Sequence, residues 1–362
     1  MLKENVQFHG LGQCGSKLGM LFSSFGYRVD YYNSDIVDVR NTGIPKNDLL
    51  LVTTSGTGRS TIKGKEIMHD HLEAFEKFLV KRMEKGKMQI FLVGLGGGTG
   101  GSSIETAIEI AKEQGFKIGV IATLPQTMAG MLAMGNAIST LKALKAKEND
   151  IHMFIVADNQ YLSETIGLGE EWWHEINNCI ISNVVSVFNL LREDKISHSG
   201  IGSIDRAEIL RVLQYGKGFA DIREISFSAD EVNSISEEEL KVKLFKACFV
   251  EGYNYKNTLA YLVSIDMPTK GVYTNFSSKV FDITKNVCGS SISLLGMFID
   301  PTLTDTIRVT IVNSGLKLPN ILKSRMNNLK RDAERHSAKK NKIDGLDFSS
   351  VDDVNLDEDF EF

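Results

Sequence analysis

The chain has 362 residues, 42% of them hydrophobic, which is enough for two packed domains with separate cores. Its 41 basic and 46 acidic side chains give a net charge of −5, which excludes a general electrostatic attraction to nucleic acid or to anionic membranes. The four cysteines never have CxxC spacing, and neither a signal peptide nor an apolar run of membrane-spanning length occurs, so we expect a cytoplasmic protein without a zinc or redox site.

Through the first half of the chain, short apolar runs alternate with segments of helical period. Helices are expected around the apolar residues Met68, Leu72, Phe75 and Leu79 and over residues 101–114 and 128–147. The expected strands are Val6–His9, Val29–Tyr32, Leu49–Thr53, Gln89–Val93, Lys117–Leu124 and Ile151–Ala157. This alternation predicts a Rossmann-like α/β domain, with a parallel sheet covered by helices on both faces.

A long helix is expected next, because six apolar residues recur at steps of three and four and so share one stripe. They are Trp173, Ile176, Ile180, Val184, Val187 and Leu191. A helix from Glu170 to Arg192 would be roughly 35 Å long. That length suits a spine shared by two domains, and it also suits an ordinary core helix.

The second half of the chain has a different pattern. Strands are expected at Ile222–Ser228, Thr258–Ile265, Ile292–Phe298 and Ile307–Val312, with helices near residues 236–249 and 273–286. This pattern predicts a smaller α+β domain. The expected organisation is a first domain over residues 1–169, the central helix over 170–192 and a C-terminal domain over 193–316.

The last part of the chain contains a predicted basic amphipathic helix, over residues 317–343. Leu322, Met326, Leu329 and Ala333 lie at helical steps among Lys and Arg residues. Residues 344–362 contain acids but no Lys or Arg, and they predict a disordered tail. A basic helix with an apolar stripe suits a protein partner, and the alternative is a solvated helix with a solubilising tail.

The first glycine loop, Gly10–Gly15 (GLGQCG), follows a strand and fits the GxGxxG pattern of a phosphate-binding turn. Alone it is weak evidence, since tight strand-to-helix turns use glycine for purely backbone reasons. It leaves open an NAD(P)-dependent oxidoreductase, with Asp30 or Asp35 as the acid that binds the ribose.

The second glycine loop, Gly94–Ser103, has six glycines in its first eight residues, and it also lies between a strand and a helix. Unobstructed amides at a helix N-terminus can bind phosphate, and Thr99 adds a hydroxyl donor. The third loop, Ser55–Ser60, has the same setting. Three such loops fit a nucleoside triphosphate, whereas a nicotinamide cofactor needs one. No GxxxxGK[ST] occurs, which excludes a P-loop NTPase.

With these loops the chain resembles the tubulin/FtsZ superfamily of GTPases. Gly96–Gly100 (GGGTG) is similar to the signature loops GGGTGSG of tubulin and GGGTGTG of FtsZ, and Gly12–Gly19 (GQCGSKLG) is similar to GQCGNQIG of tubulin. Asn33–Asp35 resembles the NTD segment of FtsZ. Residues 204–209 and 299–310 resemble the FtsZ segments VDFADV and D-x-x-x-x-D-x-x-R-V-T.

The resemblance spans residues 5–316. It implies the tubulin/FtsZ fold, binding of GTP or GDP with Mg²⁺, and head-to-tail assembly of subunits into a filament. It also places the guanine near the central helix, where an Asn amide can accept from guanine N1–H or N2–H₂ and donate to O6, whereas adenine presents a different pattern. The loops and the resemblance together assign the nucleotide to Gly12, Gln13, Cys14, Asn33, Gly56, Thr57, Gly58, Gly96, Gly97, Gly98, Thr99, Gly100, Asn159, Asn177 and Asn178. No side chain is assigned as a metal ligand.

The resemblance further implies that GTP is hydrolysed only where subunits meet. Asp205 and Glu208 lie in a segment that, in the family, projects into the nucleotide of the next subunit, where they would orient the attacking water. No acid or histidine other than His9 lies in or beside Gly10–Gly19 and Gly94–Ser103. The alternative is helix capping, because an acid followed three residues later by Glu also marks a helix N-terminus.

One loop departs from the FtsZ pattern. Where FtsZ has PFxFEG followed by Arg, Pro125–Ala133 (PQTMAGMLA) has Ala129 in place of Glu, and no Arg. This favours the TubZ-like proteins, which segregate plasmid or phage DNA through a small DNA-binding adaptor, here by the C-terminal helix or tail. An FtsZ-like cell-division protein is the alternative, and Asp205 and Glu208 disfavour a homologue that binds nucleotide without hydrolysing it.

Overall fold

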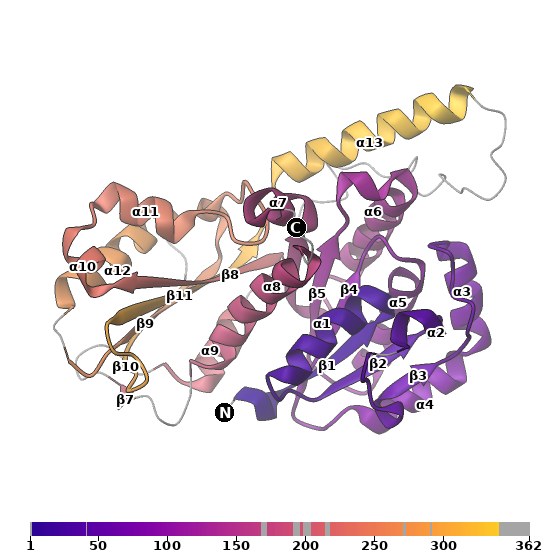
Figure 1. The fold of residues 1–362 in the computed structure, drawn as a ribbon, viewed down its shortest axis with the longest axis horizontal. Helices are drawn as coiled ribbons and strands as arrows, with labels where there is room; N and C mark the ends of the chain where they lie inside the picture. Colours follow the sequence, from indigo (N-terminus) through magenta and orange to yellow (C-terminus); the bar gives the residue numbers. More distant parts are fainter. Residues whose placement is uncertain are drawn as a thin grey trace. The chain divides into compact units, whose positions relative to one another are not determined.

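The computed structural model describes residues 2–40, 42–167, 172–190, 196–197, 204–213, 218–270, 273–289 and 292–339. The chain divides into two compact units (Figure 1). We name them the N-terminal unit, Lys3–Ile181 with Leu318–Phe362, and the C-terminal unit, Ser182–Lys317 with Met1–Leu2. The expected tail, residues 344–362, lies outside the described residues. None of the described helices is long and apolar enough to cross a membrane.

The N-terminal unit is built on six parallel strands in the order β3-β2-β1-β4-β5-β6. They are β1 Val6–Leu11, β2 Val29–Asn33, β3 Leu49–Leu51, β4 Met88–Gly94, β5 Ile118–Leu124 and β6 Ile151–Asp158. All six expected strands are confirmed to within two residues at each end. β1 and β5 are buried along their whole length, as parallel strands between two helical layers are.

Helices cover both faces of this sheet (Figure 1). They are α1 Gly12–Ser24, α2 Ile36–Val39, α3 Thr61–Asp70, α4 Leu72–Arg82, α5 Gly98–Glu113, α6 Met131–Ala146, α7 Asn159–Ile166 and α13 Asn320–Lys339, with short 3-10 helices η1 Leu2–Asn5, η2 Lys46–Asp48 and η3 Thr127–Ala129. α3, α4 and α6 pack against α5, whereas α1 packs against β1, β2 and β4. The connections β1 to β2 and β4 to β5 run in opposite directions, so right-handed crossovers place α1 and α5 on opposite faces.

The helical segment expected through Met68 and Leu79 is two helices. α3 ends and α4 begins at His71, whose backbone angles, φ −115° and ψ 15°, are not helical. Met68, Phe75 and Leu79 are buried, while Leu72 is 43% exposed. The apolar spacing alone could not reveal the bend, because it is compatible with one helix or with two.

The central helix α8 spans Trp172–Phe188, so it ends four residues before the expected Arg192. Residues 168–171 and 191–195 lie outside the described part of the chain. The boundary between the two units falls inside α8, after Ile181, so both units contain part of it. The expected apolar stripe is buried at Ile176, Ile180, Val184 and Val187, whereas Trp173 is 39% exposed.

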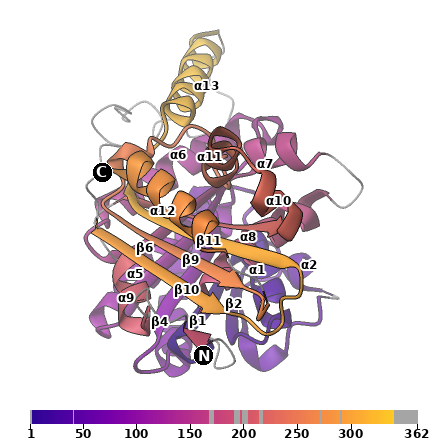
Figure 2. The ribbon, with the colours of Figure 1, turned by 90° about the vertical axis from the view of Figure 1, so that its left-hand side faces the viewer.

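The C-terminal unit is a smaller α+β domain, as expected, with five strands in the order β7-β10-β9-β11-β8 (Figure 2). Its strands are β7 Ile196–Ser197, β8 Phe219–Ser228, β9 Ala260–Met267, β10 Ile292–Ile299 and β11 Thr306–Leu316, and its helices are α9 Arg206–Leu213, α10 Ala229–Ser234, α11 Glu237–Phe245, α12 Thr274–Cys288 and the short η4 Tyr255–Asn257. α12 packs against α11 and β9, and α9 packs against β9 and β11. The helix expected near residues 236–249 is α11, which ends at Phe245.

The C-terminal helix α13 belongs to the N-terminal unit and packs against α6. Leu322 and Met326, two residues of its apolar stripe, are buried with 2% and 0% of their surface exposed. Arg325 forms two hydrogen bonds of 2.8 Å with the two carboxylate oxygens of Asp158 at the end of β6. The sequence predicted a helix outside the resembling fold that offers its apolar stripe to a partner, but this part of the stripe is used within the chain.

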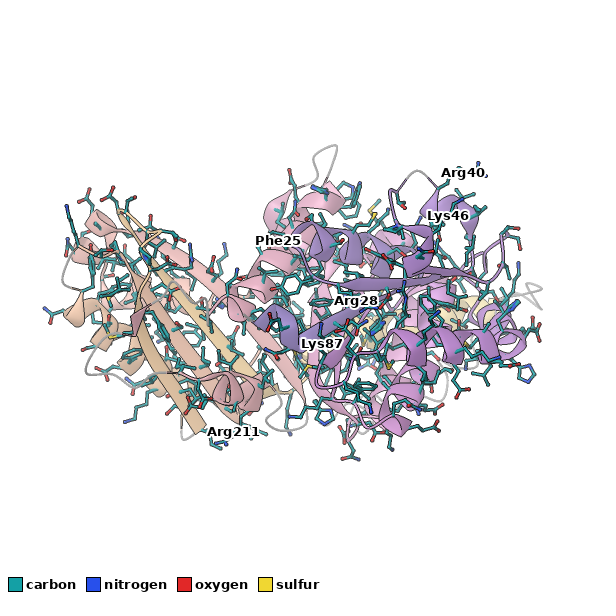
Figure 3. The ribbon with its side chains drawn as sticks, turned by 90° about the horizontal axis from the view of Figure 1, so that it is seen from below. Phe25, Arg28, Arg40, Lys46, Lys87 and Arg211 are labelled. Carbon is teal, nitrogen blue, oxygen red and sulfur yellow. The ribbon has the colours of Figure 1, made fainter. Side chains whose placement is uncertain are left out.

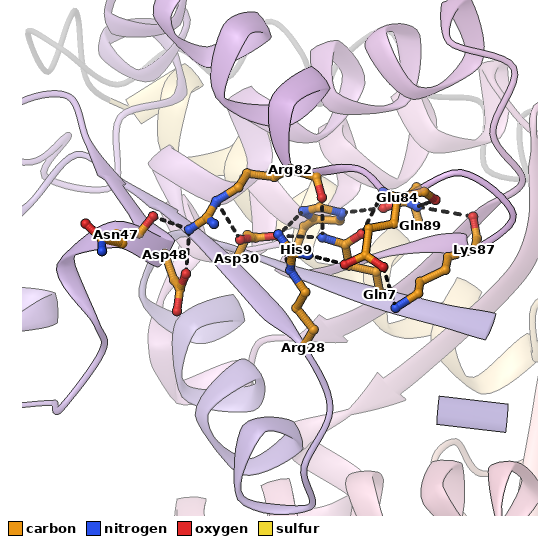
Figure 4. A network of polar contacts seen from close by, with 10 residues as sticks. All are labelled: Gln7, His9, Arg28, Asp30, Asn47, Asp48, Arg82, Glu84, Lys87 and Gln89. Atoms are coloured by element: carbon orange, nitrogen blue, oxygen red, sulfur yellow. Dashed lines mark hydrogen bonds and ion pairs between the residues drawn. The ribbon is translucent and has the colours of Figure 1, made fainter. Parts of the chain in front are cut away.

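A buried polar network joins β1, β2 and β4 near their amino ends (Figure 4). Gln7 Nε2 donates to Asp30 Oδ2 at 2.6 Å, and Arg82 Nε lies 3.0 Å from Asp30 Oδ1. His9 Nε2 is hydrogen-bonded to Gln89 Oε1 at 2.7 Å. Burial lowers the pKa of His9 to about 4, so the imidazole is neutral near neutral pH.

Three basic side chains at this end of the unit, Arg28, Arg82 and Lys87, are paired with carboxylates. Arg28 and Lys87, labelled in Figure 3, both form ion pairs with Glu84, Lys87 at 2.7 Å. Arg82 also pairs with Asp48. The positive charge is therefore shared with acids and does not form an uninterrupted basic surface.

Candidate functional site

A cavity of about 350 Å³ opens where the strand order of the N-terminal unit reverses, between β1 and β4. Open α/β sheets bind ligands at this switch point, beyond the carboxyl ends of the strands. The lining residues are Leu11, Gly12, Gln13, Cys14, Asp35, Asp38, Gly56, Thr57, Gly58, Arg59, Gly94, Gly96, Gly97, Gly98, Thr99, Gly100, Thr123, Pro125, Ala129, Ala133 and Asn159. All three expected glycine loops therefore meet in one place.

Two helix N-termini face this cavity. α5 begins at Gly98, three residues before the expected start, so its first turn is part of the glycine loop itself. α1 begins at Gly12. Neither helix has a side-chain cap or an acid in its first turn, which leaves backbone N–H groups and the positive end of each helix dipole for a ligand. Such a pair of N-termini suits a polyphosphate.

Gly98 is required by close packing between two of the loops. A Cβ at this position would touch Thr57 Oγ1 and lie 2.7 Å from the carbonyl oxygen of Ser60. Gly12 is required for its backbone, because its φ of 69° lies in the left-handed region. The signature glycines thus bring the loops together as well as leaving room for a ligand.

Side-chain hydrogen bonds fix the loops against one another. Ser34 Oγ lies 2.6 Å from Thr99 Oγ1, and Cys14 Sγ lies 3.2 Å from Thr123 Oγ1. Burial raises the pKa of the Cys14 thiol, so this residue acts as a neutral packing group and not as a thiolate. Asn33 is not among the lining residues, and its Oδ1 accepts from the backbone N–H of Ser34 at 2.8 Å. Its contact with the nucleotide stays a prediction.

Two carboxylates line the cavity, although the glycine loops themselves contain none. Gln13 Nε2 donates to Asp38 Oδ1 at 2.8 Å, and Asp35 Oδ1 accepts from the backbone N–H of Val37 at 2.9 Å. Burial, together with the charge of Asp35, raises the pKa of Asp38. From the sequence, Asp35 is a candidate ribose acid and belongs to the segment that resembles FtsZ, whereas Asp38 was not predicted because it belongs to no motif.

The three asparagines expected to contact the base have different surroundings. Asn159 lines the cavity, and its buried Oδ1 has no hydrogen-bond partner among the described residues. Asn177 is buried and Asn178 is exposed, and neither is among the lining residues. Adjacent residues of an α-helix point about 100° apart, so Asn177 and Asn178 face different directions, and their contact with the base stays a prediction.

Asp205 and Glu208 lie at the start of α9, in the C-terminal unit, and do not line this cavity. The backbone N–H of Asp205 donates to Glu208 Oε2 and the backbone N–H of Glu208 donates to Asp205 Oδ1, both at 2.8 Å. These reciprocal bonds are a helix cap, the alternative that the sequence left open. The capping role is confirmed, and the catalytic role stays a prediction.

Comparison with known proteins gives a consistent result. Residues 5–167 match the model of the family described as Tubulin/FtsZ family, GTPase domain. Over 361 residues the chain is 24% identical to a tubulin-like protein CetZ of Pyrococcus furiosus, covering 94% of this chain and 96% of that protein. All residues that line the cavity fall inside the 5–167 match.

Solved structures agree on the fold. A GTPγS-form protofilament of TubZ from Bacillus thuringiensis serovar israelensis superimposes with a TM-score of 0.78 at 17% identity, covering 92% of each chain. A GTPγS-bound protofilament of CetZ2 from Haloferax volcanii gives a TM-score of 0.74 at 18% identity, covering 92% of this chain and 99% of that one. The fold therefore extends beyond the matched domain to both units.

Proposed function

We propose that the cavity binds GTP or GDP with Mg²⁺ and that the protein hydrolyses GTP as part of a cytoskeletal filament, because residues 5–167 match the model of the Tubulin/FtsZ family, GTPase domain. The observation that carries the proposal is the meeting of two uncapped helix N-termini, at Gly12 and Gly98, in one cavity. An NAD(P)-dependent oxidoreductase would use the first glycine loop and leave the other two without a role.

The phosphates bind to backbone amides. The N–H groups from Gly97 to Gly100 surround the β- and γ-phosphates, and those from Gly12 to Cys14 lie under the α- and β-phosphates. Thr99 adds a hydroxyl to the same cradle. No Lys lines the cavity in the described part of the chain, so amide dipoles replace the lysine of a P-loop.

Mg²⁺ fits the donors present in this cavity. Asp35 and Asp38 offer hard oxygen ligands, and the raised pKa of Asp38 marks a carboxylate that a nearby cation would help to ionise. The described residues contain no group of three or more metal-ligating side chains, which suits an ion that keeps waters and phosphate oxygens as its other ligands. When bound, it neutralises charge on the phosphates.

Guanine is the base that Asn159 favours. Its Oδ1 is an unpaired buried acceptor, which guanine N1–H or N2–H₂ can satisfy, whereas adenine has an acceptor at N1 and no amino group at C2, so it offers no donor at these two positions. Leaving such a group unpaired costs roughly 1–3 kcal/mol, so GTP should bind about ten- to a hundredfold more tightly than ATP. A nucleotide panel of GTP, GDP, ATP and NAD measured by calorimetry tests this, and equal affinity for GTP and ATP would refute it.

Hydrolysis is completed by the next subunit of the filament. Asp205 and Glu208 of one subunit orient the water that attacks the γ-phosphate held by its neighbour, so that turnover requires assembly. Support comes from the resemblance at residues 204–209 and from the protofilaments formed by the TubZ and CetZ2 proteins.

The cellular role we propose is segregation of plasmid or phage DNA through a small DNA-binding adaptor. The departure of Pro125–Ala133 from the FtsZ pattern supports it, together with a fold shared with TubZ. The match over nearly the whole chain is to the tubulin-like protein CetZ, which supports a cytoskeletal protein without specifying a cargo. Deleting the gene should raise the loss rate of its own replicon and leave cell division unchanged. Stable inheritance together with altered cell shape or division would contradict this role.

A further inference from the structure

We propose that Arg59 binds the terminal phosphate of the nucleotide and thereby makes the cavity distinguish a triphosphate from a diphosphate. The inference rests on the proposed nucleotide cavity and adds to it a specificity-determining side chain that the sequence motifs did not single out. Four observations carry it: the charges of the lining, the position of the loop, the contacts of the guanidinium and the backbone conformation.

Arg59 is the one basic side chain among the described residues that line the cavity. The other charged lining residues, Asp35 and Asp38, are acids. A terminal phosphate carries roughly −1.5 to −2 charges near neutral pH, which amide dipoles alone balance only in part. An arginine offers both a permanent charge and a planar set of donors that matches phosphate oxygens.

The loop that carries Arg59 packs against the second glycine loop, which is proposed to bind the phosphates. Thr57 and Ser60, on either side of it, are the two residues that a Cβ on Gly98 would meet. Asn136 Nδ2 donates to the carbonyl oxygen of Arg59 at 2.8 Å and to that of Gly96 at 3.2 Å. One buried amide thus holds the Arg59 backbone and the signature glycine loop together.

The guanidinium reaches across to the loop before α6. Arg59 Nη1 donates to the carbonyl oxygen of Ala129 at 3.2 Å, and Ala129 also lines the cavity. This bond uses one of five N–H donors and fixes the direction of the side chain. The other four donors remain for a ligand in the cavity that Arg59 also lines.

The backbone of Arg59 has a φ of 66°, the one positive value among the described non-glycine residues. Its neighbours Gly56 and Gly58 have φ values of 63° and 60°, so glycine occurs at the other two left-handed positions of the loop. An arginine at a position that favours glycine is strained, and strained residues are common at ligand-binding sites. The conformation therefore supports a functional role for the Arg59 side chain.

The test compares the affinities of GTPγS and GDP for unassembled subunits, measured by calorimetry with Mg²⁺ below the concentration at which filaments form. Arg59→Ala should weaken GTPγS binding about ten- to a hundredfold and change GDP binding less than about threefold. Arg59→Gly removes the same side chain while suiting the backbone, so it should give the same change in the GTPγS-to-GDP ratio with no loss of stability. Lys63→Ala removes an exposed charge from the start of α3 and is the matched control, with no expected change.

The outcomes are distinguishable. Equal weakening of both nucleotides would mean that Arg59 contacts something they share, and unchanged affinities for both nucleotides in both variants would mean that it contacts neither, so either result overturns the inference. Wild-type protein that binds neither nucleotide would overturn the proposed function itself.

Discussion

Single residues of the glycine loops determine how closely the loops and a phosphate can approach one another. Gly97 and Gly98 are adjacent, yet their surroundings differ. A Cβ on Gly98 would meet Thr57 and Ser60, whereas a Cβ on Gly97 would lie 3.6 Å from the carbonyl oxygen of Gly94, an ordinary contact. The two positions therefore separate packing from ligand binding.

We predict that Gly98→Ala lowers the free energy of unfolding by about 1–3 kcal/mol, because the added carbon overfills a packed contact, and that it weakens GTP binding as well. Gly97→Ala should leave stability within about 0.5 kcal/mol of wild type and weaken GTP binding alone. Urea unfolding and nucleotide calorimetry check both. Equal GTP affinity in wild type and both variants would show that this loop does not bind the phosphates.

His9 gives a prediction for pH. Burial lowers its pKa from 6.5 to about 4, so the folded protein resists protonation that the unfolded chain accepts. The stabilisation is fully present above pH 6.5 and is lost as pH falls toward 4. The charged groups facing it are Asp30, with an oxygen 4.0 Å from Nδ1, and the Arg28 and Arg82 side chains, which also oppose protonation.

Between pH 7.5 and pH 5, wild type should lose about 2 kcal/mol more unfolding free energy than the His9→Gln variant, a value that follows from the shift at about 1.4 kcal/mol per unit. Urea titrations at several pH values measure the difference. Asp30, whose pKa burial raises, titrates in both proteins, so the comparison isolates His9. If the unfolding free energies of the two proteins change with pH in parallel, the lowered pKa of His9 is contradicted.

The site residues show what sequence can and cannot supply. The glycines were predictable because only they permit the turns and close contacts found here. Asp38 and Arg59 were missed, since they reach the cavity through the geometry of their loops and belong to no recognised spacing. Asn177 and Asn178 were included by likeness of position on α8, which does not specify where a side chain points.

Among the elements, α13 is the one whose role differs most from expectation. None of the site loops expected from the sequence lies in residues 318–362, so the sequence alone predicts that deleting them spares nucleotide binding. Arg325 of α13 instead pairs with Asp158, and the next residue, Asn159, lines the cavity. Asp158 also caps α7 by accepting from the backbone N–H of Gln160 at 3.1 Å. A periodic apolar pattern predicts such a helix but not the surface it covers.

We predict that Arg325→Met destabilises the protein by up to about 3 kcal/mol and weakens GTP binding, because it leaves a buried carboxylate without its partner. Adding Asp158→Asn, which keeps an oxygen for the α7 cap, should recover part of the loss. Deleting residues 340–362, which leaves α13 whole, is the control and should leave both quantities unchanged. If Arg325→Met binds GTP with the affinity of wild type, then α13 does not support the nucleotide cavity and the prediction is wrong.

The six strands of the N-terminal unit followed from apolar runs to within two residues, since buried parallel strands are apolar on both faces. In the C-terminal unit β8 starts three residues earlier and β11 ends four residues later than expected, and β7 was not expected. Helix ends were less predictable. α5 starts inside the glycine loop because glycine amides, without a side-chain cap, form its first turn. The break at His71 between α3 and α4 could not be predicted, because the apolar spacing fits one continuous helix and two helices equally well.

At the scale of the whole molecule, the cavity lies in one unit and the two acids proposed for hydrolysis lie in the other. The proposal that a neighbouring subunit supplies those acids must be separated from their capping role. Gln also serves at the third position of a capping box, so Glu208→Gln keeps the cap and removes only the carboxylate.

We predict that Glu208→Gln binds GTP and assembles as wild type does, yet hydrolyses GTP at least about a hundredfold more slowly and leaves longer-lived filaments. Phosphate release, sedimentation and unfolding free energy are measured on the same preparation. A variant that is less stable but hydrolyses at the wild-type rate would show that Glu208 acts as a cap alone.

The central claim is that the active site exists only in the filament, and phosphate release per subunit at increasing protein concentration tests it most directly. Wild-type protein with GTP and Mg²⁺ should show almost no turnover below a threshold concentration and a steep rise above it, at the concentration where filaments first sediment. Turnover per subunit that stays constant from the most dilute sample upward would contradict the account.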